Sequence, residues 1–163
     1  MMDSMTLPRG VNAEQVGVIV VDHGSRRAES NDMLLDVVAM FERLSEWRII
    51  EPAHMEIAEP TIAAAFKKCV ERGAKLVVVH PYFLLPGKHW HTDIPNLTAE
   101  AAHQFPGAGV KWMVTAPLGQ HALMAQIMNA RITHCLSHVG GKGPECDICA
   151  GKSHCTLHTG DSR

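Results

Sequence analysis

The sequence lacks a long apolar run and a strong charge of either sign. Its longest apolar stretch, Leu76 to Leu85, is interrupted by His80 and Pro81 and is too short to span a bilayer. The formal net charge is −2, whereas a domain that binds nucleic acid usually carries a positive field. We therefore expect a globular protein with neither a membrane nor a nucleic acid as partner.

Two common catalytic motifs are also missing. There is no HExxH helix, which holds zinc in many hydrolases, and no GxxxxGK[ST] loop, which cradles the phosphates of a nucleotide. These gaps argue against a zinc hydrolase of that type and against a P-loop enzyme that hydrolyses a nucleotide.

The N-terminal segment shows no recognisable targeting signal. Residues 1–15 lack the apolar segment of a signal peptide, and they are too short and too acidic for an ordinary transit peptide. The sequence as it stands predicts a cytoplasmic protein. The alternative is the plastid stroma, if a transit peptide has been removed.

What the chain does have is histidine and cysteine. It contains eleven histidines and five cysteines, and four of the cysteines crowd the C-terminus: Cys135, Cys146, Cys149 and Cys155. In a reducing compartment such a cluster indicates a metal site before disulfides. The fifth, Cys69, lies on the apolar face of a predicted helix and is expected to be an inert core residue.

Short β-branched runs alternate with stretches of helical periodicity. Strands are expected at 16–21, 49–56, 75–79 and 110–116, and helices around 34–44, 60–72, 93–104 and 121–137. Four strand–helix units in succession predict an α/β fold of three layers, in which a four-stranded parallel sheet has helices on both faces and right-handed crossovers.

The composition changes after Val139. The residues GGKGP form a linker, and the segment beyond is polar and rich in cysteine. We therefore expect one domain at 16–139, a Gly-linked tail at 140–163 to which Cys135 contributes from the last helix, and a flexible N-terminus at 1–15. The tail is too polar to form a core and is predicted to become ordered around a metal.

Chemically reactive residues follow three of the predicted strands. In open parallel sheets, ligands bind outside the carboxyl ends of the strands. These ends carry Asp22, His23, Gly24 and Ser25; His54, Met55, Glu56 and Ile57; and His80, followed by Lys88, His89 and His91. The sequence thus predicts that histidines and a carboxylate converge on one edge of the sheet, which we call the rim.

Not every histidine is an equal candidate. His54 and His80 lie inside strand patterns and are expected to be buried and hydrogen-bonded, and the helical histidines are expected at the surface or at helix ends. His23 and His89 lie in Gly-bearing loops, where the backbone can approach a ligand. Glu59 precedes Pro60 and suits a helix N-terminus. Glu56 has no such structural task.

A His/Glu/His set suits a borderline divalent metal such as Fe²⁺ or Co²⁺. Imidazole, with an unperturbed pKa of about 6.5, also accepts a proton near neutrality. One rim therefore offers both metal ligands and proton acceptors.

Three segments carry a resemblance to a known family. The stretches VDHGSR, MEIAEPTI and PYFLLPGKHWHTDIP, each after a predicted strand, resemble the short, single-domain sirohydrochlorin chelatases of the cobalt/iron chelatase family. The resemblance covers about 16–139 in order and spacing. The segments RRAESN, EPAHME, GKHWHTDIP and HCLSHV, with the four-cysteine tail, resemble the plant-type sirohydrochlorin ferrochelatases. The fold that this implies is a flavodoxin-like chelatase lobe.

The resemblance implies insertion of Fe²⁺ into sirohydrochlorin to give sirohaem, without nucleotide hydrolysis. The family's catalytic and metal-ligating residues correspond to His23, Glu56 and His89. Neighbouring residues are expected to bind the carboxylate-rich substrate: Ser25, Arg26, Arg27, Lys88 and His91. The alternatives are a cobaltochelatase of corrinoid synthesis that uses the same residues, and a non-enzymatic metal carrier.

The cysteine spacing, C-x₁₀-C-x₂-C-x₅-C, fits two kinds of metal site. Four thiolates satisfy an iron–sulfur cluster or a structural Zn²⁺ equally well. The plant-type resemblance implies an iron–sulfur cluster, with two irons the favoured nuclearity. A homodimer is expected as well, because four strands leave edges to be covered and one lobe offers half a cleft for a wide macrocycle.

Overall fold

The computed structural model describes residues 6–152 and 155–158. The chain divides into two compact units, Met1–Gly119 and Gln120–Arg163, which are described separately. The last helix thus groups with the cysteine-rich segment, twenty residues before the predicted boundary at Val139. The predicted domain limits remain a prediction.

The first unit is built on a four-stranded, wholly parallel sheet. Its strands are β1 (Val16–Asp22), β2 (Ile49–His54), β3 (Leu76–Pro81) and β4 (Lys111–Val114), in the order β2-β1-β3-β4. The central strand β1 pairs with both β2 and β3, and its first six residues are all buried. The parallel sheet predicted from the sequence is confirmed, with the β2 and β4 strands shorter than expected.

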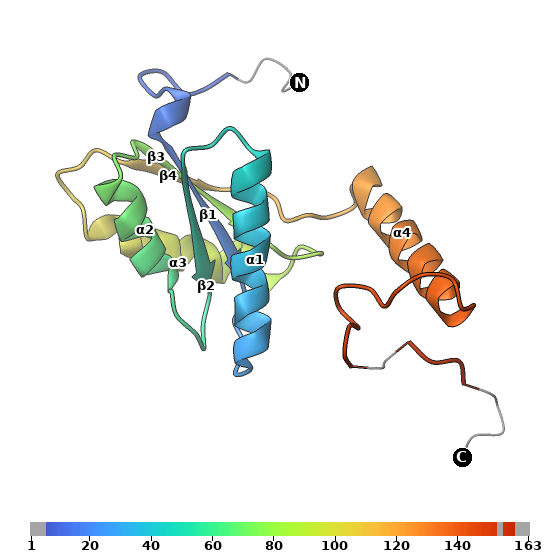
Figure 1. The fold of residues 1–163 in the computed structure, drawn as a ribbon. Coiled ribbons are helices and arrows are strands. Elements are labelled where there is room, and N and C mark those ends of the chain that lie inside the picture. Colours follow the sequence, from blue (N-terminus) through green and yellow to red (C-terminus); the bar gives the residue numbers. More distant parts are fainter. Residues whose placement is uncertain (1–5, 153–154, 159–163) are drawn as a thin grey trace. The chain divides into compact units, whose positions relative to one another are not determined.

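Helices cover both faces of this sheet (Figure 1). Helix α1 (Ala28–Leu44) packs against one face, where Leu34 and Val38 join the side chains of Val18 and Val20. Helices α2 (Ile62–Glu71) and α3 (Ile94–His103) pack against the other face, which Ile19 and Val21 line. The alternation of side chains along β1 therefore supplies two cores, and the three-layer α/β fold is confirmed.

Two short helical turns accompany the strands and α-helices of the first unit. The first unit also contains a 3₁₀ turn, η1 (Ala13–Gln15), ahead of β1, and a π-helical turn, η2 (His89–Asp93), that runs directly into α3. The helix expected from about Asp93 therefore starts four residues earlier, and it starts at a predicted site residue. π-helical turns are found frequently at functional sites. This turn brings the side chains of His89 and Asp93 to face each other.

Cys69 is a core residue, as predicted. It is fully buried on α2, and burial raises the pKa of its thiol to about 12. A Cβ atom built on Gly17 would lie 2.9 Å from the Cβ of Cys69, so the glycine allows α2 to approach β1 closely. Cysteine acts here as a small apolar side chain.

The second unit consists of α4 (Ala122–Val139) and the cysteine-rich segment after it. No helix in the described part of the chain is both long and apolar enough to cross a membrane. Two histidines of α4 fasten the linker back to the helix: His134 Nε2 lies 3.1 Å from the Pro144 carbonyl oxygen, and His138 Nδ1 lies 3.1 Å from that of Gly143.

Candidate functional site at the rim of the sheet

The buried imidazole of His54 pairs with the partly exposed carboxylate of Asp22. Nδ1 of His54, whose side chain is 1% exposed, lies 2.6 Å from Asp22 Oδ1. The same carboxylate oxygen accepts a hydrogen bond of 2.9 Å from the backbone N–H of Gly24. Asp22 therefore ties the loop after β1 to the end of β2, and the predicted structural role of His54 is confirmed.

The loops after β1 and β2 are joined through their backbones. The N–H of Met55 donates to the Asp22 carbonyl at 2.8 Å, and the N–H of Glu56 donates to the His23 carbonyl at 3.1 Å. Gly24 has a φ of +85°, and a Cβ atom there would lie 2.0 Å from the Glu56 carbonyl oxygen. Only glycine fits at this close approach, which places residues 23 and 56 side by side.

His23 and Glu56 form a direct pair. Nε2 of His23 lies 2.8 Å from Glu56 Oε1, and both side chains are about half exposed. Nδ1 of His23 lies 3.1 Å from the carbonyl oxygen of Gly24. Both ring nitrogens of His23 thus face oxygen acceptors.

His89 meets this pair from the loop after β3. Its ring lies edge-on to the ring of His23, with centroids 5.2 Å apart and an interplanar angle of 71°. Its Nδ1 lies 2.7 Å from Asp93 Oδ2, one turn further along the chain. The structure therefore brings together His23, Glu56 and His89, which come from three separate segments, as the sequence predicted.

The residues predicted to bind substrate lie around this group. Ser25 shapes the start of α1, since its Oγ accepts a hydrogen bond of 3.1 Å from the Arg27 N–H and its backbone is held by Asn31. Arg26, Arg27, Lys88 and His91 are exposed. In the described residues, no hydrogen bond or ion pair joins these four side chains to His23, Glu56 or His89.

Two other residues have the structural roles that the sequence indicated. His80 is partly buried and its Nδ1 lies 2.7 Å from Thr115 Oγ1, while burial lowers the pKa of its imidazole. Glu59 Oε2 accepts a hydrogen bond of 3.0 Å from the N–H of Thr61, the residue that caps α2. Both are accounted for by local structure.

The rim residues adjoin one another but do not form a closed metal cage. Across residues 6–152 and 155–158, no three His, Cys, Asp or Glu side chains are arranged to coordinate one ion. Nε2 of His23 points at Glu56 instead.

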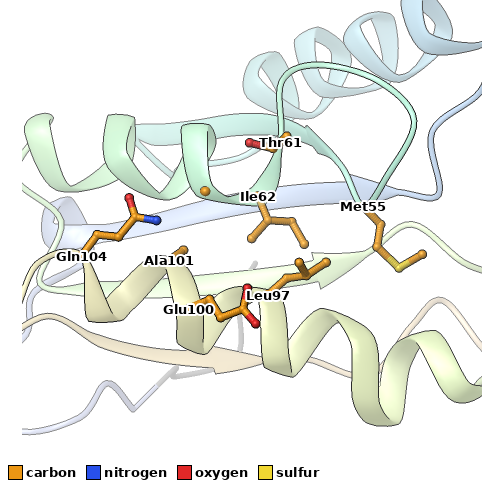
Figure 2. Close-up of a pocket in the computed structure, with 8 residues that line it drawn as sticks. Met55, Thr61, Ile62, Leu97, Glu100, Ala101 and Gln104 are labelled. Carbon is orange, nitrogen blue, oxygen red and sulfur yellow. The ribbon is translucent and has the colours of Figure 1, made fainter.

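A separate pocket lies between α2 and α3 (Figure 2). It has a volume of about 210 Å³, and its lining is formed by Met55, Thr61, Ile62, Ala63, Leu97, Glu100, Ala101 and Gln104. None of the predicted catalytic, metal-ligating or substrate-binding residues is in this lining. Glu100 is the one ionisable group there, and a single carboxylate gives the pocket no metal-binding or proton-relay set.

Two of the four tail cysteines, Cys135 on α4 and Cys155, approach each other. Sγ of Cys155 lies 3.9 Å from Sγ of Cys135, and the N–H of Cys149 donates to the Cys146 carbonyl at 3.1 Å. The backbone N–H of Cys149 lowers the pKa of the Cys146 thiol, and hydrogen bonding with Cys149 raises the pKa of the Cys155 thiol to about 12. Arg131 forms a two-pronged ion pair with Asp147, which fixes the Cys146–Cys149 turn to the helix.

A family model described as CbiX matches residues 17–135. The chain belongs to the CbiX family. The match spans all four strands and ends at Cys135, so the remaining cysteines lie outside it.

Named relatives of this CbiX chain include chelatases for two metals. The chain is 57% identical, over 142 residues, to the chloroplastic sirohydrochlorin ferrochelatase of Arabidopsis thaliana, covering 87% of this chain and 62% of that protein. It is 30% identical over 125 residues to a sirohydrochlorin cobaltochelatase of Sulfolobus acidocaldarius, covering 77% of this chain and 96% of that protein. The chain thus accounts for only part of the Arabidopsis protein and for nearly all of the archaeal one.

The fold matches a solved chelatase structure. The sirohydrochlorin chelatase SirB of Bacillus subtilis subspecies spizizenii, in complex with cobalt, superposes with a TM-score of 0.68 at 26% identity. The alignment covers 73% of this CbiX chain and 50% of the SirB chain. The matched segment therefore accounts for about half of the SirB chain.

Two acidic residues of the site were not predicted as site residues. Asp22 and Asp93 lie within the sequence motifs of the CbiX chain, but the sequence assigns neither of them a role. The signal for Asp93 was available, since a carboxylate four residues after a histidine faces it on the next helical turn. Asp22 gave no such signal, because its partner His54 is remote in sequence and adjacent only through the β1–β2 register.

Proposed function

We propose that this protein is a sirohydrochlorin ferrochelatase, which inserts Fe²⁺ into sirohydrochlorin to give sirohaem without hydrolysing a nucleotide. The observation that carries the proposal is the meeting of His23, Glu56 and His89, with 2.8 Å between His23 and Glu56 and 5.2 Å between the imidazole rings. The identity to the Arabidopsis ferrochelatase supports iron as the metal.

The chemistry requires an ion held over the face of the macrocycle and a sink for two protons. Fe²⁺ enters as the two pyrrole N–H bonds break, so each ion inserted releases two protons. His89 and His23 bind the ion through imidazole nitrogens, and Glu56 balances its charge. As the ion passes to the macrocycle, the imidazoles and the carboxylate accept the protons that it displaces.

Basic residues beside the rim are suited to the carboxylates of the substrate. We propose that Ser25, Arg26, Arg27, Lys88 and His91 receive them. Arg26 and Arg27 directly precede the first turn of α1, where the helix dipole adds to their attraction for an anion. His91 packs against Trp90, with ring centroids 4.4 Å apart, and it remains exposed two residues after His89.

Cobaltochelatase activity is the second candidate, and the 30% identity to the Sulfolobus cobaltochelatase favours it. A metal carrier without enzymatic activity is the third. Anaerobic incubation of the purified protein with sirohydrochlorin and either Fe²⁺ or Co²⁺, followed by absorbance, separates them. Faster insertion of Fe²⁺ supports the proposal, faster insertion of Co²⁺ supports the second candidate, and metal binding without a spectral change of the macrocycle leaves the carrier.

The tail is proposed to hold a [2Fe–2S] cluster apart from the rim. Thiolates are the ligands that such a cluster takes, and two of the four thiols, those of Cys135 and Cys155, already lie 3.9 Å apart. Cys135, Cys146, Cys149 and Cys155 are the proposed ligands, and a structural Zn²⁺ is the alternative. A bound cluster would supply a redox-active centre for tuning or sensing. The visible spectrum and the iron and sulfide content of anaerobically purified protein test this, and colourless protein with stoichiometric zinc would overturn it.

A homodimer is proposed from the single lobe. The strands β2 and β4 are the edges of the sheet, and the solved SirB chain is about twice as long as the part that matches. A second copy of this chain would provide the other half of a cleft wide enough for a macrocycle. Light scattering of the active protein should give twice the mass of one chain, and a fully active monomer would refute the proposal.

The plastid stroma is the proposed location. The Arabidopsis relative is named chloroplastic, and this name supports the same compartment for this protein. Immunoblotting of purified chloroplasts and of the remaining cell fractions tests it, and protein found only outside plastids would contradict it.

A further inference from the structure

Asp93 makes a contact that the proposed mechanism has not used. Its Oδ2 lies 2.7 Å from Nδ1 of His89, and its side chain is 29% exposed against 44% for His89. Asp93 sits at the N-terminal end of α3 but makes no side-chain hydrogen bond to cap that helix. Its carboxylate is therefore directed at the histidine and not at the helix backbone.

The position of Asp93 is well fixed. The next residue, Ile94, is fully buried in the core, and its carbonyl accepts a hydrogen bond of 2.7 Å from the buried Thr98 hydroxyl. On the other side, Trp90 donates its indole N–H to the Thr115 carbonyl at 2.8 Å, which anchors the turn to the end of β4. The turn that carries both members of the His89–Asp93 pair is thus held at two points.

The hydrogen bond determines which ring nitrogen of His89 is available. An ionised carboxylate can only accept, so Nδ1 must carry the hydrogen, and Nε2 then keeps its lone pair. His23 differs, because its Nε2 is already paired with Glu56 and its Nδ1 faces a carbonyl oxygen. Of His23 and His89, only His89 has a ring nitrogen with no hydrogen-bond partner in the described residues.

We propose that Asp93 is a positioning residue that holds His89 as the Nδ1–H tautomer and so presents Nε2 as the first protein atom to meet the incoming metal ion. The inference deepens the proposed ferrochelatase function and rests on it. A carboxylate behind a metal-binding histidine fixes the ring's orientation and raises its basicity, and loss of such a partner costs about 10- to 100-fold in metal affinity. His23 and Glu56, which are already paired, join the ion after it has arrived.

The test compares Asp93→Leu with Asp93→Asn. Leucine has a similar volume but no acceptor, whereas asparagine keeps an oxygen that accepts from Nδ1–H. Asp93→Ala is the replacement if the leucine variant does not fold. Asp36→Ala, on the exposed side of α1, is the matched control for loss of one carboxylate.

Two readouts do not depend on turnover. Long-range ¹H–¹⁵N correlation spectra of the imidazoles, with His89 assigned by its loss in His89→Gln, report the tautomer at one fixed pH. Titration with Co²⁺ reports metal affinity. We expect Asp93→Leu to lose the Nδ1–H tautomer of His89 and to bind Co²⁺ about 10- to 100-fold more weakly, with Asp93→Asn and Asp36→Ala close to wild type.

Steady-state kinetics add a third readout. Asp93→Leu should raise KM for Fe²⁺ while leaving KM for sirohydrochlorin unchanged. An unchanged tautomer, or unchanged Co²⁺ affinity, in the folded leucine variant overturns the inference. If the wild type inserts no metal while the tautomer and the affinity change as expected, the proposed function fails and the role of Asp93 in metal binding stands.

Discussion

The rim and the cysteine-rich tail both collect residues that bind metals, but they are held in different ways. At the rim, backbone hydrogen bonds join the loops after β1 and β2, and the buried His54 side chain pairs with Asp22. In the tail, the cysteine segment is fastened to α4 by exposed side chains, chiefly the Arg131–Asp147 ion pair. Surface ion pairs contribute little to stability.

The difference indicates that the rim and the tail depend on a bound metal in different ways. If the rim passes an ion to a substrate, as proposed, it has to be preorganised before the ion binds, and the sheet provides this preorganisation. A segment with too little apolar surface for a core of its own depends on a bound group for its order. We therefore expect changes at the rim to affect insertion and changes in the tail to affect the bound cofactor, with little cross-effect.

The largest expected effect is from His89→Ala. Loss of a ligand that also accepts a proton should slow insertion at least about 100-fold. The fold should persist, because the His89 side chain is 44% exposed and belongs to a rim loop. The measurements are the initial rate of absorbance change with Fe²⁺ and the thermal unfolding midpoint. His103→Ala, an exposed histidine at the end of α3, is the matched control, and a folded His89→Ala protein with wild-type turnover would remove His89 from the mechanism.

Cys146→Ser should produce the opposite result. The tail should lose its bound metal, seen as loss of the visible absorbance of a cluster or of zinc content, while most of the insertion rate remains. Cys69→Ala is the control, since Cys69 lies in the core and should leave the cofactor untouched. Parallel loss of cofactor and of insertion would show that the two regions are functionally joined.

The two regions also differ in how much of them could be predicted from the sequence. The parallel sheet could be predicted because β1 and β3 are short, mainly apolar runs without helical periodicity. The meeting of His23, Glu56 and His89 followed from where the strands end. Asp22 was missed because its contact to His54 depends on strand register. The π-helical turn at His89 was missed because its hydrogen-bond pattern leaves no distinct mark on the hydrophobic spacing.

Gly24→Ala tests whether the close packing of the two rim loops matters. The left-handed φ and the 2.0 Å approach of a Cβ atom to the Glu56 carbonyl together predict a loss of about 2–5 kcal/mol in the free energy of unfolding. Gly73→Ala is the control, because Gly73 has a φ of +95° but no atom within 4 Å of a Cβ. Chemical denaturation should show a smaller loss for the control, and equal losses would mean that the contact with Glu56 costs nothing.

The smallest effect concerns Cys69, whose thiol contrasts with the four in the tail. Burial raises the pKa of Cys69 to about 12 from an ordinary 9.0. Below pH 9 the thiol is protonated in both the folded and the unfolded chain. Between pH 9 and about 12 the unfolded chain loses this proton and the folded chain keeps it, so the contribution of Cys69 to stability declines across that interval.

A thiol titration of metal-free protein at pH 8 measures the contrast directly. Cys135 is partly exposed and should react with Ellman's reagent in the folded protein, whereas Cys155, whose pKa is raised to about 12, and the buried Cys146 should react more slowly. Cys69 should react only after unfolding in urea, because it is fully buried and remains a thiol. Cys69→Ala should therefore lower the thiol count by one in urea and leave the count for the folded protein unchanged. A lower count in the folded variant would show that Cys69 reacts in the folded wild-type protein. It would follow that α2 opens in the native state and that the core beneath the rim is not firmly closed.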